Sequence, residues 1–130
     1  MRTSIRLASA FCYSTHMRII KQDQTQVFKN SDMMTSREYP FGDKDINAAV
    51  IELDGRYPEA GFVMNKVCKE IAYIIDGDGT LTTGGETHEL HKGDTAFILP
   101  GEKYYFEGRL TMFMPCAPAW YAEQHVEVEA

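Results

Sequence analysis

Short apolar runs separated by glycine- and aspartate-rich reversals most constrain what this chain can fold into. Apolar segments such as 71–75 and 95–99 alternate with four reversal signals, Asp76-Gly77-Asp78-Gly79, Gly84-Gly85, Lys92-Gly93-Asp94 and Pro100-Gly101. Asp-Gly and Gly-Gly pairs supply the positive backbone φ that tight turns need, so each predicts a strand end. Strands this close together leave no room for helices between them. The pattern predicts an all-β fold, an antiparallel barrel or sandwich.

The predicted strands recur about every ten residues, which is typical of all-β domains. We expect strands at 18–21, 25–28, 46–53, 62–67, 70–76, 79–83, 86–90, 94–99, 103–107 and 109–116, with an edge strand within 123–128. Residues 33–37 are expected to form a loop or one helical turn. The chain has 130 residues, which is enough for one domain with a modest core.

The first sixteen residues are expected to stand outside this domain. They carry Arg2 and Arg6 and a small-residue triplet, but the apolar run is far too short for a signal peptide. We interpret 1–16 as a poorly ordered extension before a barrel domain at 17–130. The competing interpretation is an arm that pairs with a second subunit, since sheet edges are often covered in this way.

The net charge and the cysteine content limit the kinds of binding partner and the cellular compartment that we expect. The formal net charge of −6 argues against a nucleic-acid surface, which needs clustered Lys and Arg, and against an anionic membrane. No segment approaches the roughly 20 apolar residues of a membrane span. The three cysteines, Cys12, Cys68 and Cys116, lack CxxC spacing and are expected to be reduced thiols of a cytoplasmic protein. A small-molecule ligand remains as the expected partner.

Two glycine-anchored half-motifs give the sequence a family resemblance. Glu70 is followed by six residues and Gly77, while Gly93 and Gly101 are separated by seven residues. This order resembles the cupin superfamily, whose motifs are G-x5-H-x-H-x3,4-E-x6-G and G-x5-P-x-G-x2-H-x3-N. The resemblance covers roughly residues 45–120 and implies a jelly-roll β-barrel with a ligand cavity inside.

The metal-binding positions of that family are mostly replaced. By the motif spacing, the family's metal-binding histidines would stand at Val63 or Met64, at Asn65 or Lys66, and at Tyr104. Only Glu70 of the four expected ligands is retained. Transition metals prefer imidazole or thiolate ligands. We therefore expect no standard cupin metal centre and no cofactor, with a non-standard metal held by Glu70 and His125 as the alternative.

Strand alternation selects the candidate site residues. Glu70 shares a face with Ala72 and Ile74, and the resemblance implies that this face is the barrel interior. A carboxylate among apolar neighbours must find a partner or hold its proton more tightly, so Glu70 is a candidate acid or base or a structural ion-pair member. Tyr104, which shares a face with Phe106, is either a hydrogen-bond donor to a ligand or a core tyrosine.

Asn65 and Lys66 compete for the next inward position. Alternation allows one of them to face the cavity, where Lys66 would favour an anionic ligand and Asn65 a neutral polyol or amide. Buried lysines are rare, which favours Asn65.

The C-terminal segment supplies the remaining candidates. Trp120, Glu123 and His125 follow the last core strand, where small cupins often fold back near the cavity mouth. Trp120 could stack on a ring or sugar face, and His125 could act as a base. The alternative is a plain edge strand with an exposed histidine. His88 and His91 are expected to be exposed, and Cys68 and Cys116 to be buried.

Three functions fit this pattern. The first is a cupin that binds a small polar metabolite, such as a sugar or sugar derivative, without a standard metal. The second is an isomerase or lyase acting on a sugar phosphate or keto acid, with Glu70 as acid or base. The third is a structural module whose barrel is filled with side chains. Exposed sheet edges and an apolar outer face around Ile71, Tyr73 and Ile75 favour a homodimer in all three cases.

Overall fold

The computed structural model describes residues 17–129, whose regular secondary structure is almost entirely β-strand. The strands are β1 (Gln26–Ser31), β2 (Met34–Glu38), β3 (Asn47–Tyr57), β4 (Phe62–Asn65), β5 (Lys69–Thr83), β6 (Glu86–His91), β7 (Thr95–Ile98), β8 (Tyr104–Ala117) and β9 (His125–Val128). Two 3₁₀ turns, η1 (Gln22–Gln24) and η2 (Ala122–Gln124), are the helical elements of this region. The predicted all-β fold is confirmed.

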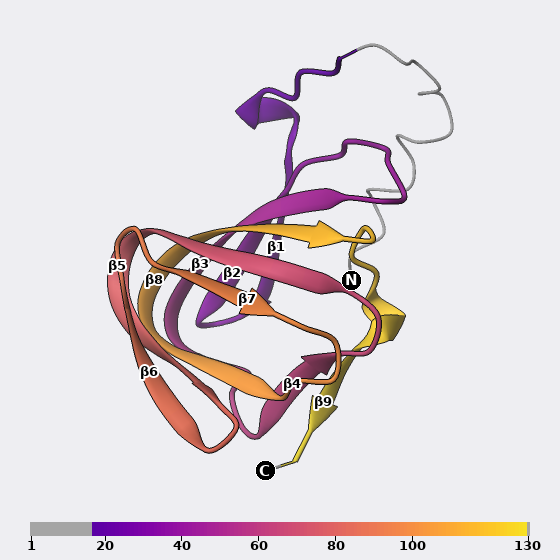
Figure 1. The fold of residues 1–130 in the computed structure, drawn as a ribbon. Helices are drawn as coiled ribbons and strands as arrows, with labels where there is room; N and C mark the ends of the chain where they lie inside the picture. Colours follow the sequence, from indigo (N-terminus) through magenta and orange to yellow (C-terminus); the bar gives the residue numbers. More distant parts are fainter. Residues whose placement is uncertain (1–16, 130) are drawn as a thin grey trace.

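The strands form one curled antiparallel sheet. β8 lies between β3 and β5 and pairs with both over most of its length, while β4 pairs with the start of β8 and with β9. β5 pairs first with β7 and then with β6. In Figure 1, β5 and β8 curve together round one end of the molecule, on the left, so that each contributes to both layers of a barrel.

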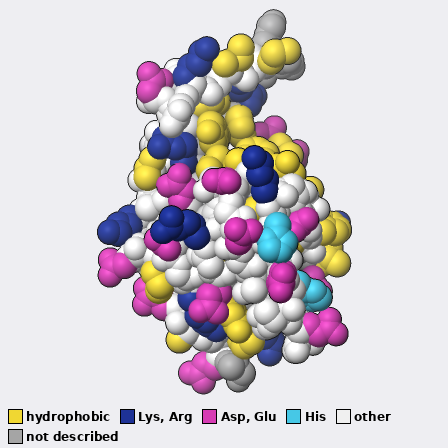
Figure 2. Space-filling model, turned by 90° about the vertical axis from the view of Figure 1, so that its left-hand side faces the viewer, with side chains coloured by type: hydrophobic (Ala, Val, Ile, Leu, Met, Phe, Trp, Pro, Cys, Tyr) yellow, Lys and Arg dark blue, Asp and Glu magenta, His cyan; other side chains and the backbone are white. Residues whose placement is uncertain are grey.

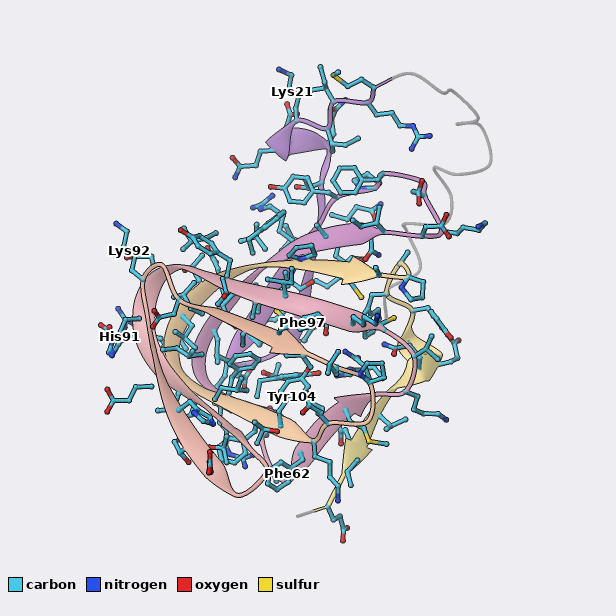
Figure 3. All side chains as sticks on the ribbon, viewed as in Figure 1. Lys21, Phe62, His91, Lys92, Phe97 and Tyr104 are labelled. Carbon is cyan, nitrogen blue, oxygen red and sulfur yellow. The ribbon has the colours of Figure 1, made fainter. Side chains whose placement is uncertain are left out.

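Strand β5 alternates between the barrel interior and solvent as its sequence predicts. Ala72 and Ile74 are fully buried and Glu70 is 8% exposed, whereas Ile71 and Tyr73 are about two-fifths exposed. Apolar side chains from β2, β3, β5 and β8 meet between the layers and form the core. Tyr104 lies in this space between the layers (Figure 3). The inward face of β5 therefore places a carboxylate inside an apolar barrel.

The Asp-Gly-Asp-Gly segment is not the strand reversal that the sequence predicts. β5 runs through it as one strand with a bulge between Ile74 and Asp76, and β8 likewise runs unbroken through Gly108. The reason is close approach of the backbones: Gly79 pairs with Gly108, which pairs with Gly55 on its other side. A Cβ at Gly79 would lie 2.5 Å from the Glu107 carbonyl oxygen. These glycines permit a bend, whereas Gly84-Gly85, Lys92-Gly93 and Pro100-Gly101 are the predicted turns.

Two predictions near the start of the domain are wrong. Residues 18–21 form no strand, and 33–37, expected as a loop or helical turn, belong mostly to β2. β2 pairs with both β1 and β3, so its backbone is used by the sheet although its sequence, Met-Thr-Ser-Arg-Glu, has little apolar content. The predicted extension 1–16 lies outside the described residues. The predicted edge strand is present as β9.

An apolar surface covers the outer face of β5, β7 and β8. Its cross-strand pairs are Ile71 with Phe97 and Tyr73 with Phe113, and Phe97 is 64% exposed. A homodimer could bury this apolar surface, and the homodimer remains a prediction. Across residues 17–129 there is no helix long and apolar enough to cross a membrane.

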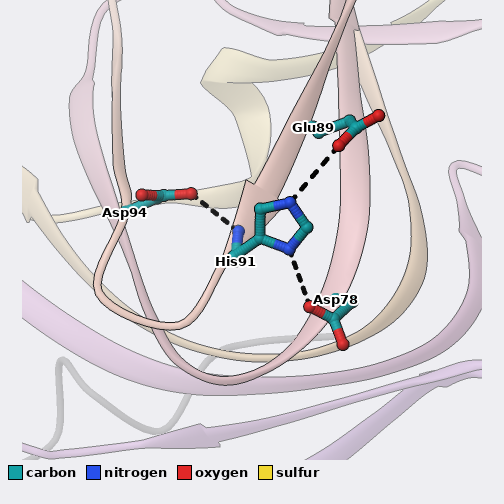
Figure 4. A network of polar contacts seen from close by, with 4 residues as sticks. All are labelled: Asp78, Glu89, His91 and Asp94. Carbon is teal, nitrogen blue, oxygen red and sulfur yellow. Dashed lines mark hydrogen bonds and ion pairs between the residues drawn. The ribbon is translucent and has the colours of Figure 1, made fainter.

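The turn between β6 and β7 is held by a histidine among carboxylates. His91 Nδ1 lies 2.7 Å from Asp78 Oδ1 and Nε2 lies 3.3 Å from Glu89 Oε1, and the His91 backbone N–H donates to Asp94 Oδ2 (Figure 4). Figure 2 shows this end of the barrel, where histidines lie among acidic side chains. His88 and His91 are both more than half exposed, as predicted.

Replacing His91 with glutamine is expected to remove a stabilisation that depends on pH. Hydrogen bonds from the His91 ring to the Asp78 carboxylate and, less strongly, to the Glu89 carboxylate raise the pKa of His91 above its ordinary value. A histidine whose pKa is higher in the folded state stabilises the fold. The full stabilisation is present when the pH lies below the unfolded-state pKa of about 6.5, and it is lost as the pH rises through the folded-state pKa. Urea unfolding should show a larger loss for the variant near pH 5.5 than near pH 8.5. Because His91 and its two carboxylates are exposed, high salt should reduce the difference between the losses at the two pH values. An equal loss of stability at both pH values would contradict this prediction.

Candidate functional site

A pocket opens between the two layers of the barrel. Its walls are mainly apolar and aromatic side chains, from β2, β3, β8 and the segment after β8: Met34, Ala48, Ala49, Ile51, Leu53, Phe106, Met112, Met114, Cys116 and Trp120. Its polar lining is Glu38, Asn47, Tyr57, Glu70, Tyr104 and His125. About 50 Å³ is open to the centre of a water-sized sphere, several times the roughly 10–15 Å³ that one water needs. The cavity near Glu70 argues against the filled-barrel alternative.

A chain of hydrogen bonds links one carboxylate of this pocket to its histidine. Asn65 Nδ2 donates to Glu70 Oε1 over 2.8 Å, and Asn65 Oδ1 lies 2.8 Å from His125 Nδ1. Gln124 Nε2 donates to the same Asn65 oxygen over 2.9 Å. β4 and β9 bring these residues together, because Asn65 and His125 are register partners in that ladder. Asn65 is fully buried and Gln124 is 2% exposed, so water does not compete for the bonds that Asn65 makes with Glu70 and Gln124.

His125 also contacts a tyrosine that lines the cavity. Its Nε2 lies 2.7 Å from the Tyr57 hydroxyl oxygen, and the two rings are within 9° of parallel. The Trp120 ring also contacts the His125 ring, and the two ring centroids are 5.5 Å apart. Both ring nitrogens of His125 are therefore engaged, and the Tyr57–His125 pair stands at the cavity surface.

A second carboxylate, Glu38 on β2, also lines the pocket. Glu38 is 2% exposed, and Ser36, fully buried, donates its hydroxyl to Glu38 Oε2 over 3.3 Å. Strand alternation explains the placement, because Met34, Ser36 and Glu38 are the buried residues of β2.

Most site residues predicted from sequence come together in this pocket. Glu70, Tyr104, Phe106, Trp120 and His125 all line it. Asn65 faces inward as predicted, but it is buried behind Glu70 and His125 and is not part of the lining.

Two predicted ligand-binding residues lie elsewhere. The Lys66 and Glu123 side chains are exposed and do not line the pocket. Lys66 follows Asn65 on the opposite side of the chain, which strand alternation requires. Glu123 stands in the 3₁₀ turn η2, where Gln124 takes the buried position. The predicted roles of both residues in ligand binding are therefore not supported by their placement.

Sequence reasoning missed several polar residues of this arrangement, among them Tyr57, Glu38 and Gln124. Tyr57 stands beside a proline, between the predicted strands 46–53 and 62–67, and Glu38 ends a strand with little apolar content. Gln124 lies between two residues that were identified, Glu123 and His125. The signal for Gln124 was weak, since one buried amide in an exposed turn has no periodic pattern. A strand interpretation of 34–38 would have placed Glu38 inward.

The donor set does not fit a standard cupin metal centre. Within residues 17–129 no three His, Cys, Asp or Glu side chains are grouped so that they could hold a metal ion. The motif spacing would place metal ligands at Glu70, which is a carboxylate, at Tyr104, which is a phenol, and at Asn65, which is an inward-facing amide. His125 already directs Nδ1 to Asn65 and Nε2 to Tyr57. An imidazole needs a free nitrogen lone pair to bind a metal.

The two described cysteines are buried, as predicted. Both thiols donate to the Pro118 carbonyl oxygen, over 3.3 Å from Cys68 and 3.4 Å from Cys116. Burial raises the pKa of the Cys68 thiol, which keeps it protonated and a poor nucleophile.

Comparison with known proteins identifies the fold. The cupin domain family model matches residues 53–112. Streptomyces PAC13 with uridine superposes with a TM-score of 0.79 at 15% identity, covering 88% of this chain and 93% of that one, and another structure describes Pac13 as a nucleoside dehydratase. Ectoine synthase from P. lautus gives 0.67 at 18% identity, with 88% and 91% covered. A cupin-superfamily sugar phosphate isomerase from Silicibacter pomeroyi gives 0.65 at 15%, with 77% and 75% covered.

No curated protein sequence matches this chain significantly. The solved structures share its fold at low identity, and the family model covers the central strands that carry Glu70 and both glycine half-motifs. Residues 53–112 match the cupin domain family, and the chain shares the β-barrel fold of the solved cupin structures.

Proposed function

We propose that this cupin binds a small uncharged sugar or sugar derivative in its barrel, without a standard metal centre. One observation carries the proposal: the pocket is lined by two buried carboxylates, Glu38 and Glu70, and none of the described side chains that line it belongs to lysine or arginine. Carboxylates accept hydrogen bonds from hydroxyl groups. Negative charge in the pocket therefore favours uncharged ligands that carry hydroxyl groups over anionic ligands.

The pocket walls suit a ring that carries hydroxyl groups. Trp120, Phe106 and Tyr104 offer aromatic surface, which packs against the C–H face of a sugar or against a base. The polar groups stand among apolar walls, and a few placed polar groups in an apolar cavity are typical of small-molecule sites. PAC13 with uridine and a sugar phosphate isomerase share the fold, which supports carbohydrate-like ligands by analogy.

When they are ionised, the same carboxylates disfavour an anionic ligand. Two like charges 5 Å apart repel by about 3 kcal/mol at an effective dielectric constant of about 20. Lys66, the cation considered from sequence for the cavity, is exposed outside the pocket. Phosphate or keto-acid substrates would need a cation that the described lining does not supply.

A second candidate function is acid–base catalysis, favoured by the Tyr57–His125 pair. A histidine within 2.7 Å of a phenol at a cavity surface has the geometry of a proton-transfer pair. Glu70 joins it through Asn65. With these groups the cupin would act as an isomerase or lyase on the bound sugar derivative, moving a proton to or from carbon or oxygen.

Calorimetric titration with neutral compounds and their phosphates tests both functions. We expect glucose, galactose or uridine to bind at least about tenfold more tightly than the matching phosphate ester, because about 1.4 kcal/mol of repulsion corresponds to a tenfold difference. Tighter binding of the phosphates, or no binding by any neutral compound, would overturn the binding proposal. NMR spectra of the same samples after long incubation report turnover, and unchanged spectra of a bound compound would count against catalysis.

A further inference from the structure

The orientation of Gln124 is fixed by the backbone. The N–H groups of Val67 and Cys68 both donate to Gln124 Oε1, over 3.1 and 3.0 Å. A backbone N–H can only donate, so the group that it meets must be the amide oxygen. The other end of the Gln124 amide, Nε2, therefore faces Asn65 as a donor.

Hydrogen bonds at both the oxygen and the nitrogen of the Asn65 amide fix its orientation. Gln124 Nε2 donates to Oδ1, and the carboxylate of Glu70 accepts from Nδ2. Turning the Asn65 amide round would place two N–H groups face to face on one side and two oxygens on the other. Because Asn65 is fully buried, the groups left unmatched could not turn to water, and each would cost about 1–3 kcal/mol.

The orientation of Asn65 in turn decides which nitrogen of His125 carries hydrogen. An amide oxygen accepts only, so His125 Nδ1, at 2.8 Å from Asn65 Oδ1, must be an N–H donor. In the neutral ring Nε2 then holds the lone pair. The Tyr57 hydroxyl, 2.7 Å from Nε2, is the donor of that hydrogen bond.

We infer that Asn65 is a positioning residue, held by Gln124 and Glu70, that fixes neutral His125 as the Nδ1–H tautomer and makes Nε2 the acceptor of the Tyr57 proton. This assigns Asn65 a role through His125 instead of the direct ligand contact expected from sequence. The tautomer does not depend on the proposed function.

Its catalytic consequence rests on the proposed acid–base function. The Tyr57 oxygen can take a proton from a bound substrate while the Tyr57 proton passes to His125 Nε2. The substrate then carries the negative charge, Tyr57 is again a phenol, and His125 is an imidazolium. One proton has moved and no oxidant or reductant is needed. The opposite tautomer would present an N–H at Nε2 and could not accept this proton.

The ¹⁵N shifts of the histidine rings test the tautomer without any ligand. Two-bond ¹⁵N–¹H spectra of the uniformly labelled full chain, recorded near pH 8.5 where an ordinary histidine is neutral, distinguish protonated from unprotonated ring nitrogens. The His125 signals are assigned by their loss in His125→Gln. We expect a protonated Nδ1 and an unprotonated Nε2. A protonated Nε2 in the wild-type protein would overturn the inference.

Two variants separate positioning from packing. Asn65→Asp keeps an oxygen acceptor for Nδ1–H and should retain the tautomer, whereas Asn65→Leu, of similar size, removes it and should populate Nε2–H. Glu127→Gln, on the exposed face of β9, is the matched control and should leave the His125 shifts unchanged. An unchanged tautomer in a folded Asn65→Leu protein would also refute the positioning role. Failure of sugar binding, by contrast, would leave these spectra as expected.

Discussion

Replacing Gly108 with alanine is expected to lower the free energy of unfolding by about 4 kcal/mol. Gly108 has a φ of +131°, and an added Cβ would lie 2.5 Å from Gly79 Cα and 2.7 Å from the Asp78 carbonyl oxygen. Positive φ costs a non-glycine residue about 1–2 kcal/mol, and overpacking costs about 1–3 kcal/mol. We expect a total cost near the upper end of the two combined ranges, because both obstructing atoms belong to the backbone and cannot move aside as a side chain would. Urea unfolding followed by Trp120 fluorescence and circular dichroism measures the loss.

Gly84→Ala is the matched control for this prediction. Gly84 also has a positive φ, +58°, but no atom lies within 4 Å of the Cβ that it would gain. It should therefore lose only the conformational cost of about 1–2 kcal/mol. Equal losses in the two variants would show that Gly108 is required for its backbone conformation alone, and that β5 and β8 do not depend on close approach.

The same glycines show why the strand boundaries were only partly predictable. Asp-Gly and Gly-Gly pairs indicate positive φ, and at Gly84-Gly85 that conformation makes a turn. At Gly77 and Gly108 it lets two strands bend and touch. The local sequence is alike in both cases. The difference lies in a partner strand about thirty residues away, as in the Gly79–Gly108 pair, and this is tertiary information that a local pattern does not contain.

The site was predictable where a periodic pattern or a motif marked it. Glu70 and Tyr104 combine motif spacing with clear alternation, so their inward orientation followed from the sequence. Glu38 follows Thr35-Ser36-Arg37, whose polar residues conceal the strand, and its burial comes from the pairing of β2 with β1 and β3.

Residues that act through other residues were the hardest to predict. Gln124 and Tyr57 have no periodic signal, and each matters because of one partner, Asn65 or His125, about sixty residues away. A buried amide between a carboxylate and an imidazole is recognisable only after the strands are paired. The two half-motifs predicted the fold, whereas no motif indicated the hydrogen bonds that Asn65 makes with Glu70 and His125.

Replacing Glu70 with glutamine is expected to weaken binding of a neutral sugar or nucleoside by about 10- to 150-fold. Hydrogen bonds to a charged group contribute about 1.5–3 kcal/mol, and a glutamine that accepts from Asn65 through Oε1 turns its amide nitrogen to the cavity. The site would then present a donor where a ligand hydroxyl needs an acceptor. Glu52→Gln removes an exposed carboxylate of β3 and should leave the affinity unchanged.

The phosphate esters make this prediction more specific. Removing the Glu70 charge also removes one source of repulsion, so Glu70→Gln should bind the phosphate ester of the same sugar more tightly than the wild-type protein does. A variant that was merely misfolded would weaken both ligands. Calorimetric titration of the pair against both proteins therefore gives two changes of opposite sign. Unchanged affinity for the neutral compound would remove Glu70 from the binding site, and weaker binding of both compounds would show that its role is structural.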